Sequence, residues 1–405
     1  MVQEDSSYPS FKRLMTPIFY PINAWEKRKV SDYLCESRIP GSNGLKAKKL
    51  TVKLWGKGVV PKNETYSGSI KTKYYVRSAN QLIYGKLDFL HAAFGIVPQS
   101  LDGWESTIDS PAFDVNTSIG NAAFLLALFL RPNFYLREGI RANGSRKAKR
   151  IHEDTFLSMS ISAPQRKEQD QIAMVLDKTE LLIAATQDKL EKLSILQRGF
   201  LQHFFAQTWR FSGYSHVWEN HRLGDVATRV RGNDGRMNLP ILTISAGKGW
   251  LTQEQRFSQN IAGNELKKYT LLSKGELSYN HGNSKLAEYG AVFVLKQFKE
   301  ALVPRVYHSF NVSGKADPDF IEYLFESGVP NHELRKLISS GARMDGLLNI
   351  NYDSFMNISV LLPSIEEQNK IARVLEKLKK LTDETRLRLF NLQQAKKSLL
   401  RMLFP

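Results

Sequence analysis

The sequence PSIEEQNKIARVLEKL, at residues 363–378, has a close counterpart in PQRKEQDQIAMVLDKT, at residues 164–179. The two stretches lie 199 residues apart. When they are extended without a gap, the alignment of residues 154–205 with residues 353–404 contains 17 identical positions out of 52. Self-similarity over such a length indicates one structural unit that occurs twice in the chain.

Weaker similarity continues upstream of these stretches. WEKRKVSDYL, which begins at Trp25, matches WENHRLGDVA, which begins at Trp218, and ANGSR at 142–146 matches SSGAR at 339–343. Between these points the two halves diverge. Each unit therefore consists of a variable globular part followed by a more similar helical part.

The helical parts have the apolar spacing of long helices. Apolar residues recur at steps of three and four, which is the pattern of a seam that faces a partner helix. The predicted seam residues are Ile172, Leu176, Ile183, Leu190, Leu193, Ile371, Leu375, Leu378, Leu389 and Leu392. Ser364 and Glu367, directly after Pro363, predict a capping box at the start of the second helix. Because a helix of about 57 Å must bury its apolar stripe, we expect the two helices to pair; the alternative is that each packs only on its own globular part.

The globular parts combine short apolar runs with turns rich in glycine, asparagine and lysine, which is typical of strands. Each part then has one apolar helix and closes with a strand that ends at a proline. We therefore predict an α+β fold that occurs twice, with the two globular domains joined by two long helices. The predicted segments are an N-terminal extension at 1–24, a first domain at 25–163, a central spacer helix at 164–207, a linker at 208–217, a second domain at 218–362 and a C-terminal spacer helix at 363–405.

Composition narrows the class of protein. The chain has 405 residues, 42% of them hydrophobic, and a net charge of +17. Such an excess of lysine and arginine favours a polyanionic partner, nucleic acid first and an anionic membrane surface second. The single cysteine, Cys35, excludes a disulfide framework and a cysteine-rich zinc site. The N-terminus lacks a signal-peptide core, and the apolar run AAFLLALFL at 122–130 is too short to span a bilayer, so we expect a cytoplasmic protein without a membrane partner.

Basic and polar residues gather in the predicted loops, where they are suited to grip DNA. Lysine and arginine neutralise phosphates, whereas arginine and asparagine pair with base edges. The candidate DNA-binding residues of the first half are Lys46, Lys48, Lys49, Lys57, Lys71, Lys73, Arg77, Tyr84, Lys86, Arg141, Asn143, Ser145, Arg146 and Lys147. Those of the second half are Arg229, Arg231, Asn233, Arg236, Lys248, Trp250, Tyr279, Asn280, His281, Asn283, Lys285 and Arg343. The alternative for each charged cluster is a solvated face without a ligand.

Motifs of catalysis and cofactor binding are missing from the sequence. It contains no G-x-x-x-x-G-K-[ST] phosphate loop, no G-x-G-x-x-G after a strand and no paired-histidine metal motif. Asp317 and Asp319 resemble the start of a metal-dependent nuclease motif, but the downstream acid-x-Lys is missing, and Asp-Pro-Asp is better explained as a helix N-cap. We therefore predict no catalytic residue, no cofactor ligand and no metal site in this chain.

The repeated pattern resembles a known family. A Trp-led opening, a closing strand with proline, the motif E-Q-x-x-I-A-x-V-L-[DE] and a leucine-rich helix, all present twice, resemble the specificity subunit of type I restriction–modification enzymes. The matching pieces are WEKRKVSDYL and PQRKEQDQIAMVLDKT in the first half, and RFSGYSHVWENHRLGDVA and PSIEEQNKIARVLEKL in the second. The resemblance extends from about Trp25 to the end of the chain.

The resemblance implies a non-catalytic DNA-binding subunit. Its globular parts would be target recognition domains, each reading one half of a split, asymmetric site in double-stranded DNA. Its helices would form an antiparallel coiled coil, with a pseudo-twofold axis, that sets a half-site spacing of about 34 Å. The implied partners are two copies of a methyltransferase (modification) subunit, which uses S-adenosylmethionine to methylate adenine, and, where the host has them, restriction/translocase subunits that use ATP and Mg²⁺. The implied setting is DNA methylation in antiviral defence.

Two other hypotheses stay open at this point. One is a stand-alone DNA-binding or scaffold protein whose helices self-associate. The other is a divergent metal-dependent nuclease built around Asp317 and Asp319.

Overall fold

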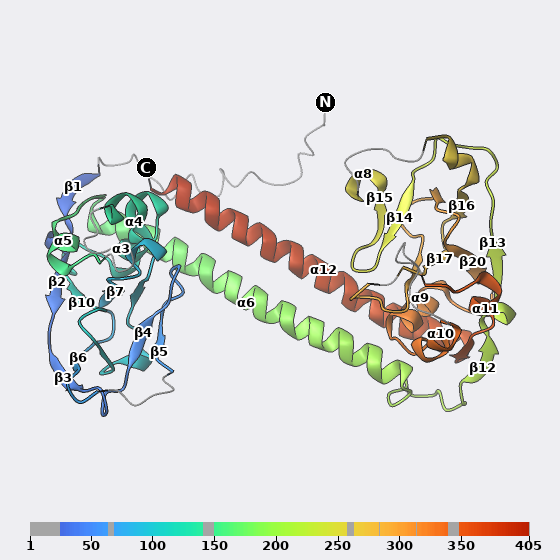
Figure 1. The fold of residues 1–405 in the computed structure, drawn as a ribbon, viewed down its shortest axis with the longest axis horizontal. Coiled ribbons are helices and arrows are strands. Elements are labelled where there is room, and N and C mark those ends of the chain that lie inside the picture. The colour runs from blue at the N-terminus through green and yellow to red at the C-terminus, as the bar shows by residue number, and fades with distance from the viewer. Residues whose placement is uncertain are drawn as a thin grey trace. The chain divides into compact units, whose positions relative to one another are not determined.

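Two compact units make up the computed structural model. It describes residues 25–63, 69–140, 150–256, 263–282, 284–312, 314–338 and 348–404. The first unit comprises the described residues up to Ala184 together with those from Asn391 onward, and the second is Ala185–Phe390. Each unit holds one globular domain, one end of α6 (Arg166–Phe205) and the opposite end of α12 (Ile365–Met402) (Figure 1).

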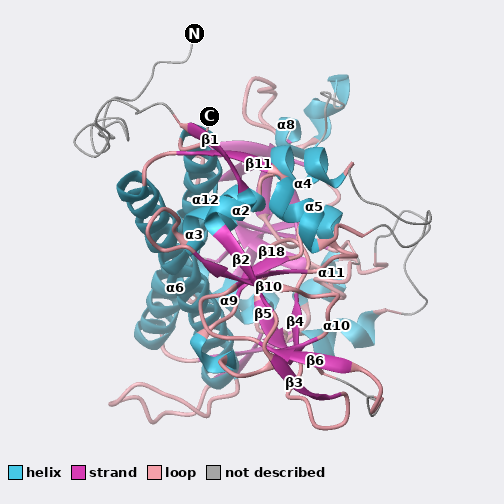
Figure 2. Cartoon of the chain, turned by 90° about the vertical axis from the view of Figure 1, so that its left-hand side faces the viewer, coloured by secondary structure: helices cyan, strands magenta, loops and turns pink. Residues whose placement is uncertain are grey.

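The first domain is built from short antiparallel strands with helices at one end. Its strands are β1 (Glu26–Lys29), β2 (Leu34–Ser37), β3 (Pro40–Asn43), β4 (Leu50–Val52), β5 (Val59–Pro61), β6 (Lys73–Val76), β7 (Leu82–Tyr84), β8 (Phe94–Ile96), β9 (Glu105–Ser106), β10 (Ala112–Val115) and β11 (Ser160–Ala163). Its helices are α2 (Val30–Tyr33), α3 (Ala122–Phe129), α4 (Pro132–Gly139) and α5 (Glu153–Ser158), with 3₁₀ turns η1 (Phe89–His91) and η2 (Gln99–Leu101). Figure 2 shows α3, α4, α5 and the β1–β11 pair toward one end of the domain and the β3–β6 pair at the opposite end.

The second domain has the same kinds of elements. Its strands are β12 (Glu219–Arg222), β13 (Ala227–Val230), β14 (Leu242–Ser245), β15 (Gly249–Thr252), β16 (Thr270–Ser273), β17 (Leu277–Asn280), β18 (Ala291–Val294), β19 (Glu300–Val303), β20 (His308–Val312) and β21 (Ser359–Leu362). Its helices are α7 (Leu223–Val226), α8 (Gln253–Arg256), α9 (Pro318–Glu326), α10 (Asn331–Leu337) and α11 (Tyr352–Met356), with the 3₁₀ turn η3 (Gly263–Lys268).

Sheet topology repeats even where the two sequences diverge. The four-stranded sheets run β2-β10-β7-β8 in the first unit and β13-β20-β17-β18 in the second, so equivalent strands take equivalent places. In both units the strand after the opening tryptophan pairs with the strand that precedes the long helix, β1 with β11 and β12 with β21. The predicted α+β class is therefore correct for both halves. Among the described residues, no helix is long and apolar enough to cross a bilayer.

The two long helices are antiparallel within each unit. In the first unit the start of α6 and the end of α12 enter the same hydrophobic core, and Lys396 of α12 forms an ion pair with Glu180 of α6. In the second unit the end of α6 and the start of α12 share a core. Of the predicted seam residues, Ile172, Leu176, Ile183, Leu193, Ile371 and Leu375 are buried, and Leu190, Leu378, Leu389 and Leu392 are half-buried.

The start of α12 differs from the predicted capping box. The Ser364 hydroxyl accepts from the Glu367 N–H at 3.4 Å, as expected. The Glu367 carboxylate does not turn back to the backbone, because Arg210 binds it with two hydrogen bonds of 2.6 and 3.0 Å. Glu367 is 1% exposed, and a bidentate charged pair stabilises a buried carboxylate better than one backbone N–H does. The prediction was wrong for this half of the box.

An aromatic triad joins each domain to the end of the helix contributed by the other repeat. In the first unit Trp25, Phe124 and Phe404 lie 5.3–5.9 Å apart between ring centroids. In the second unit Phe205 lies 5.1 Å from Phe320 and 6.3 Å from Trp218. The triads use equivalent positions, namely the opening tryptophan, the first turn of the domain helix and the last phenylalanine of each repeat, which is Phe205 at the end of α6 and Phe404 two residues beyond α12. This repeated contact gives the antiparallel arrangement a physical cause.

We expect the substitution Phe404→Ala to lower the free energy of unfolding by about 3–5 kcal/mol, the usual cost of removing a buried phenylalanine ring. The ring is 1% exposed, stacks on Phe124 and lies under the Arg131 guanidinium. Urea unfolding monitored by circular dichroism measures the change. Phe390→Ala is the matched control, because this ring on α12 is 55% exposed and should cost less than about 0.5 kcal/mol. Equal losses in the two variants would contradict the role of the triad.

Candidate nucleic-acid interface

A basic tip lies at the end of the first domain that is far from its helices. It consists of Lys46, Lys48, Lys71 and Lys73, all exposed. Strands β3 and β6 bring the two lysine pairs together, because Asn43 at the end of β3 pairs with Lys73 and the Gly44 N–H bonds to the Ser69 carbonyl at 3.1 Å. Figure 2 shows this strand pair at the end of the domain opposite α3 and α4. The arrangement is suited to phosphate contacts.

A second exposed feature of the first domain is the turn between β4 and β5. Lys57 lies in this turn next to Trp55, whose side chain is 56% exposed. Trp55 has φ of 60°, which is uncommon for a bulky residue, and its N–H is held by the His91 carbonyl at 2.8 Å. An exposed aromatic ring beside lysine is a further candidate for DNA contact. Sequence reasoning predicted Lys57 as a contact but missed Trp55, although the W-G-K-G pattern was a signal.

Three predicted contacts of the first domain lie in its interior instead. Arg77 is 2% exposed and its guanidinium donates to the Ser106 hydroxyl and the Ser37 carbonyl, and burial lowers its pKa to about 10. Tyr84 is 1% exposed and donates to the Ile151 carbonyl at 2.9 Å. Lys86 is buried and its Nζ lies 2.7 Å from a carboxylate oxygen of Glu153. These side chains stabilise the domain through internal hydrogen bonds and an ion pair. A contact with DNA is therefore not needed to explain why these positions are polar. Lys49 is half-buried and lies 5.6 Å from the Tyr74 ring centroid.

In the second domain the predicted arginines divide into two groups. Arg229 and Arg231 are exposed at the end of β13, and the Arg229 guanidinium lies 4.1 Å from the Tyr352 ring centroid. Arg236 is instead tied to Glu300 by two hydrogen bonds of 2.8 Å. Asn233 donates to the Arg236 carbonyl, so it orders the same turn. Arg229 and Arg231 are therefore the better placed pair for DNA.

Two further lysines reach the rim of a cavity in the second unit. The cavity has a volume of about 830 Å³ and opens between the turn after β14, the segment from Lys285 into β18, and helices α9 and α12. Lys248 and Lys285 are exposed on its rim. Asn280, near this rim, is half-buried, and its side-chain oxygen accepts from the Gly282 N–H at 3.1 Å. The cavity rim thus presents two cations that the sequence separates by 37 residues.

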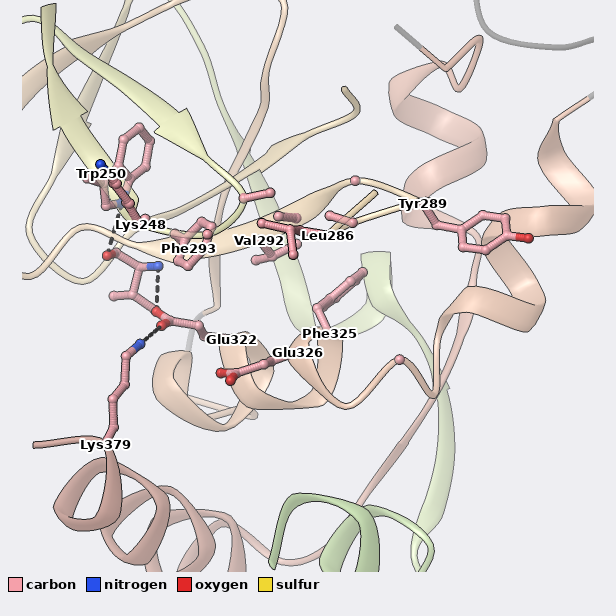
Figure 3. A pocket seen from close by; sticks show the side chains of 18 of the residues that line it. Lys248, Trp250, Leu286, Tyr289, Val292, Phe293, Glu322, Phe325, Glu326 and Lys379 are labelled. Carbon is pink, nitrogen blue, oxygen red and sulfur yellow. Dashed lines mark hydrogen bonds and ion pairs between the residues drawn. The ribbon is translucent and has the colours of Figure 1, made fainter. Parts of the chain in front are cut away.

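Trp250, a predicted DNA contact, is instead buried in the wall of this cavity. Trp250 is 8% exposed and its Nε1 donates to the Val294 carbonyl at 3.1 Å. The buried Glu322 accepts from the Val294 N–H at 2.9 Å, and Lys379 of α12 lies 3.3 Å from the same carboxylate (Figure 3). Trp250 therefore packs the β14–β15 hairpin onto the sheet.

Two more predicted contacts of the second domain, Tyr279 and His281, are buried, and His281 forms a pair with His308. The rings of His281 and His308 lie 5.0 Å apart, and Tyr279 stacks on Phe355 at 4.3 Å. His308 Nε2 lies 2.9 Å from the Ile350 carbonyl. Tyr279 and His281 are buried, so the structure gives them packing roles. Sequence reasoning missed His308, because nothing local marks it as the partner of His281.

Seven predicted contacts lie outside the described residues. They are Arg141, Asn143, Ser145, Arg146, Lys147, Asn283 and Arg343. The predicted extension at 1–24 also lies outside them.

The aspartates of the nuclease hypothesis have structural partners. Asp317 is the N-cap of α9 and accepts from the Phe320 N–H at 2.8 Å, as the Asp-Pro-Asp pattern predicted. Asp319 forms an ion pair of 2.9 Å with Lys296. In the described part of the chain, no group of three or more His, Cys, Asp or Glu residues is placed to hold a metal ion. The geometry gives the nuclease hypothesis no support.

Comparison with known proteins adds to this picture. No family model matches the chain. It is 24% identical over 271 residues to the type I restriction enzyme EcoKI specificity subunit of Escherichia coli K12, across 62% of this chain and 58% of that protein. The match thus spans little more than half the length of that relative. A solved type I restriction–modification S subunit from M. genitalium matches with a TM-score of 0.59 at 14% identity, across 96% of this chain and 98% of that one. The HsdS subunit from Thermoanaerobacter tengcongensis matches with a TM-score of 0.45 at 15% identity, across 96% and 99%.

The similarity to the EcoKI subunit and to the M. genitalium structure confirms the resemblance predicted from the repeated motifs. The sequence is similar to that of a type I restriction specificity subunit, and the fold is that of an S subunit. Because one fold can serve several functions, the fold alone does not establish the role of this chain.

The buried histidine pair predicts a pH dependence of stability. Burial lowers the pKa of His308 to about 4, although the Ile350 carbonyl opposes the shift, while His281 and Arg229 add to it. Tyr279 and Tyr352 face the same ring. The unfolded chain takes up a proton near pH 6.5 and the folded chain only near pH 4, so stability is lost as pH falls through that window, by about 3 kcal/mol.

Urea unfolding between pH 7 and pH 4 tests this expectation by comparing wild type with His308→Gln. The variant should lack this part of the acid-induced loss. His332→Gln, an exposed histidine on α10 in the same unit, is the control and should behave as wild type. Parallel pH curves for wild type and His308→Gln would contradict the assignment.

Proposed function

We propose that this chain is the DNA specificity subunit of a type I restriction–modification enzyme. One observation carries the proposal: two units with the same sheet order and the same attachment to paired helices differ in the basic residues that they expose. Two copies of one scaffold with different surfaces are what a reader of an asymmetric, bipartite DNA site requires. The sequence similarity to a specificity subunit supports the same conclusion.

Each domain would read one half-site. In the first, the basic tip and the β4–β5 turn are the proposed contact surfaces. In the second, Arg229 and Arg231 and the rim lysines Lys248 and Lys285 are the proposed surfaces. Because these residues stand at non-equivalent places of equivalent folds, the two half-sites are expected to differ in sequence.

The two long helices would form one antiparallel coiled coil that fixes the spacer between half-sites. The antiparallel packing inside each unit supports this arrangement. In this role the chain is not an enzyme. Two methyltransferase subunits would dock on it and methylate adenine N6 with S-adenosylmethionine, and restriction/translocase subunits with ATP and Mg²⁺ would complete the cytoplasmic complex. The target adenine would be flipped into a partner's pocket rather than into this chain.

Single-molecule sequencing of genomic DNA tests the proposal. A strain that expresses the neighbouring methyltransferase is compared with and without this chain. We expect a split motif carrying N6-methyladenine that appears only when the chain is present, because in the proposed complex this chain reads the sequence.

Two controls make the result decisive. The methyltransferase is shown to be present and to bind S-adenosylmethionine in both strains. No new motif under these conditions would refute the proposal and favour the stand-alone DNA-binding hypothesis, which binding of the purified chain to DNA without the methyltransferase would then support.

A further inference from the structure

A buried glutamine occupies the junction of domain and helix in each unit. Gln169 is fully buried and Gln368 is 1% exposed. Both lie in the first turn of a long helix and belong to the repeated Glu-Gln pair of the sequence. A buried amide without partners would be costly, so the contacts of these side chains show what they hold.

In the first unit the Gln169 amide joins three segments. Its oxygen accepts from the Asn121 N–H at 3.0 Å, and its nitrogen donates to the carbonyls of Ile119 at 2.9 Å and Pro164 at 2.8 Å. Asn121 is the N-cap of the domain helix α3 and accepts from the Phe124 N–H. Pro164 follows the closing strand β11. One side chain therefore links the domain helix, the closing strand and the long helix.

The second unit repeats this network with a different residue at the cap. The Gln368 oxygen accepts from the Asp317 N–H at 2.9 Å, and its nitrogen donates to the Pro363 carbonyl at 2.9 Å. Asp317 caps the domain helix α9. The same amide contacts thus persist although the neighbouring sequences diverge. Glutamine fits because its amide both donates and accepts, whereas an ionised glutamate only accepts and the methionine thioether cannot donate.

The amide contacts differ in kind from the aromatic triads. Apolar contacts hold a domain against a helix but are not directional, whereas hydrogen bonds restrict the angle between their partners. The lever is long. A recognition surface ~20 Å from the junction moves by ~3.4 Å, the rise of one base pair, when its domain rotates by ~10°.

We infer that Gln169 and Gln368 are positioning residues that fix the angle of each recognition domain on its helices, and thereby the spacer length that the protein accepts. The inference rests on the proposed function. It assigns the discrimination between correct and incorrect spacers to two buried side chains that touch no DNA. The half-site sequences are read elsewhere, so spacing and sequence preference are separable.

Gln368→Met in the full chain, co-expressed with the methyltransferase, tests the inference. Methionine keeps the volume and removes both hydrogen bonds. Single-molecule sequencing should find both half-site sequences unchanged, while methylation of sites with a spacer one base pair longer or shorter rises about tenfold, which corresponds to about 1.4 kcal/mol. Gln169→Met should have the same effect through the other domain. Gln393→Met, the same change at an exposed position of α12, should leave the spacing as in wild type.

The possible results distinguish failure of the positioning role from failure of the proposed function. If Gln368→Met and Gln169→Met both reduce methylation but leave the accepted spacer unchanged, the two glutamines have only a structural role, and the inference is overturned. If Gln368→Met gives no methylation because the chain does not fold, Gln169→Met takes its place under the same criterion. Absence of any split motif in wild type would overturn the proposed function itself, and this inference with it.

Discussion

A single buried amide in each half, Gln169 in one and Gln368 in the other, is the contact around which the architecture is arranged. Its oxygen accepts a hydrogen bond from the backbone N–H of the residue that caps the domain helix. Its nitrogen donates to the carbonyl of the proline that follows the closing strand. The aromatic triad then joins the same domain to the far end of the other long helix. A domain held to two antiparallel helices in this way has little freedom to turn.

The two halves keep this frame and vary what surrounds it. Tyr84 and Tyr279 occupy equivalent strands, β7 and β17, and both are buried. Two residues later the first half has Lys86, ion-paired with Glu153, whereas the second has His281, packed against His308. A repeat can therefore exchange its ionisable groups without changing its topology. Such exchange is the property that divergent recognition domains on one scaffold need.

Sequence alone predicted the repeat, the α+β class, the two long helices and the N-cap at Asp317, because each depends on local periodicity or local capping chemistry. It failed for Arg77, Tyr84 and Lys86, which look like loop-borne contacts but are buried. Burial is a tertiary property, and a polar residue beside a short strand gives no local sign of it. The Glu367 side chain was misjudged for a related reason, since its partner Arg210 is distant in sequence. Gln169 and Gln368 are identical positions in the alignment of the two repeats, but the sequence does not reveal which groups they bond to.

The claim that each domain reads its own half-site is tested most directly by exchanging one of them. Residues 25–163 would be replaced by the corresponding domain of a specificity subunit whose methylated motif is known, with both long helices left intact. Sequencing of the methylated genome should then show one half of the motif replaced, the other half retained and the spacer unchanged. A change in both halves, or in neither, would contradict the account.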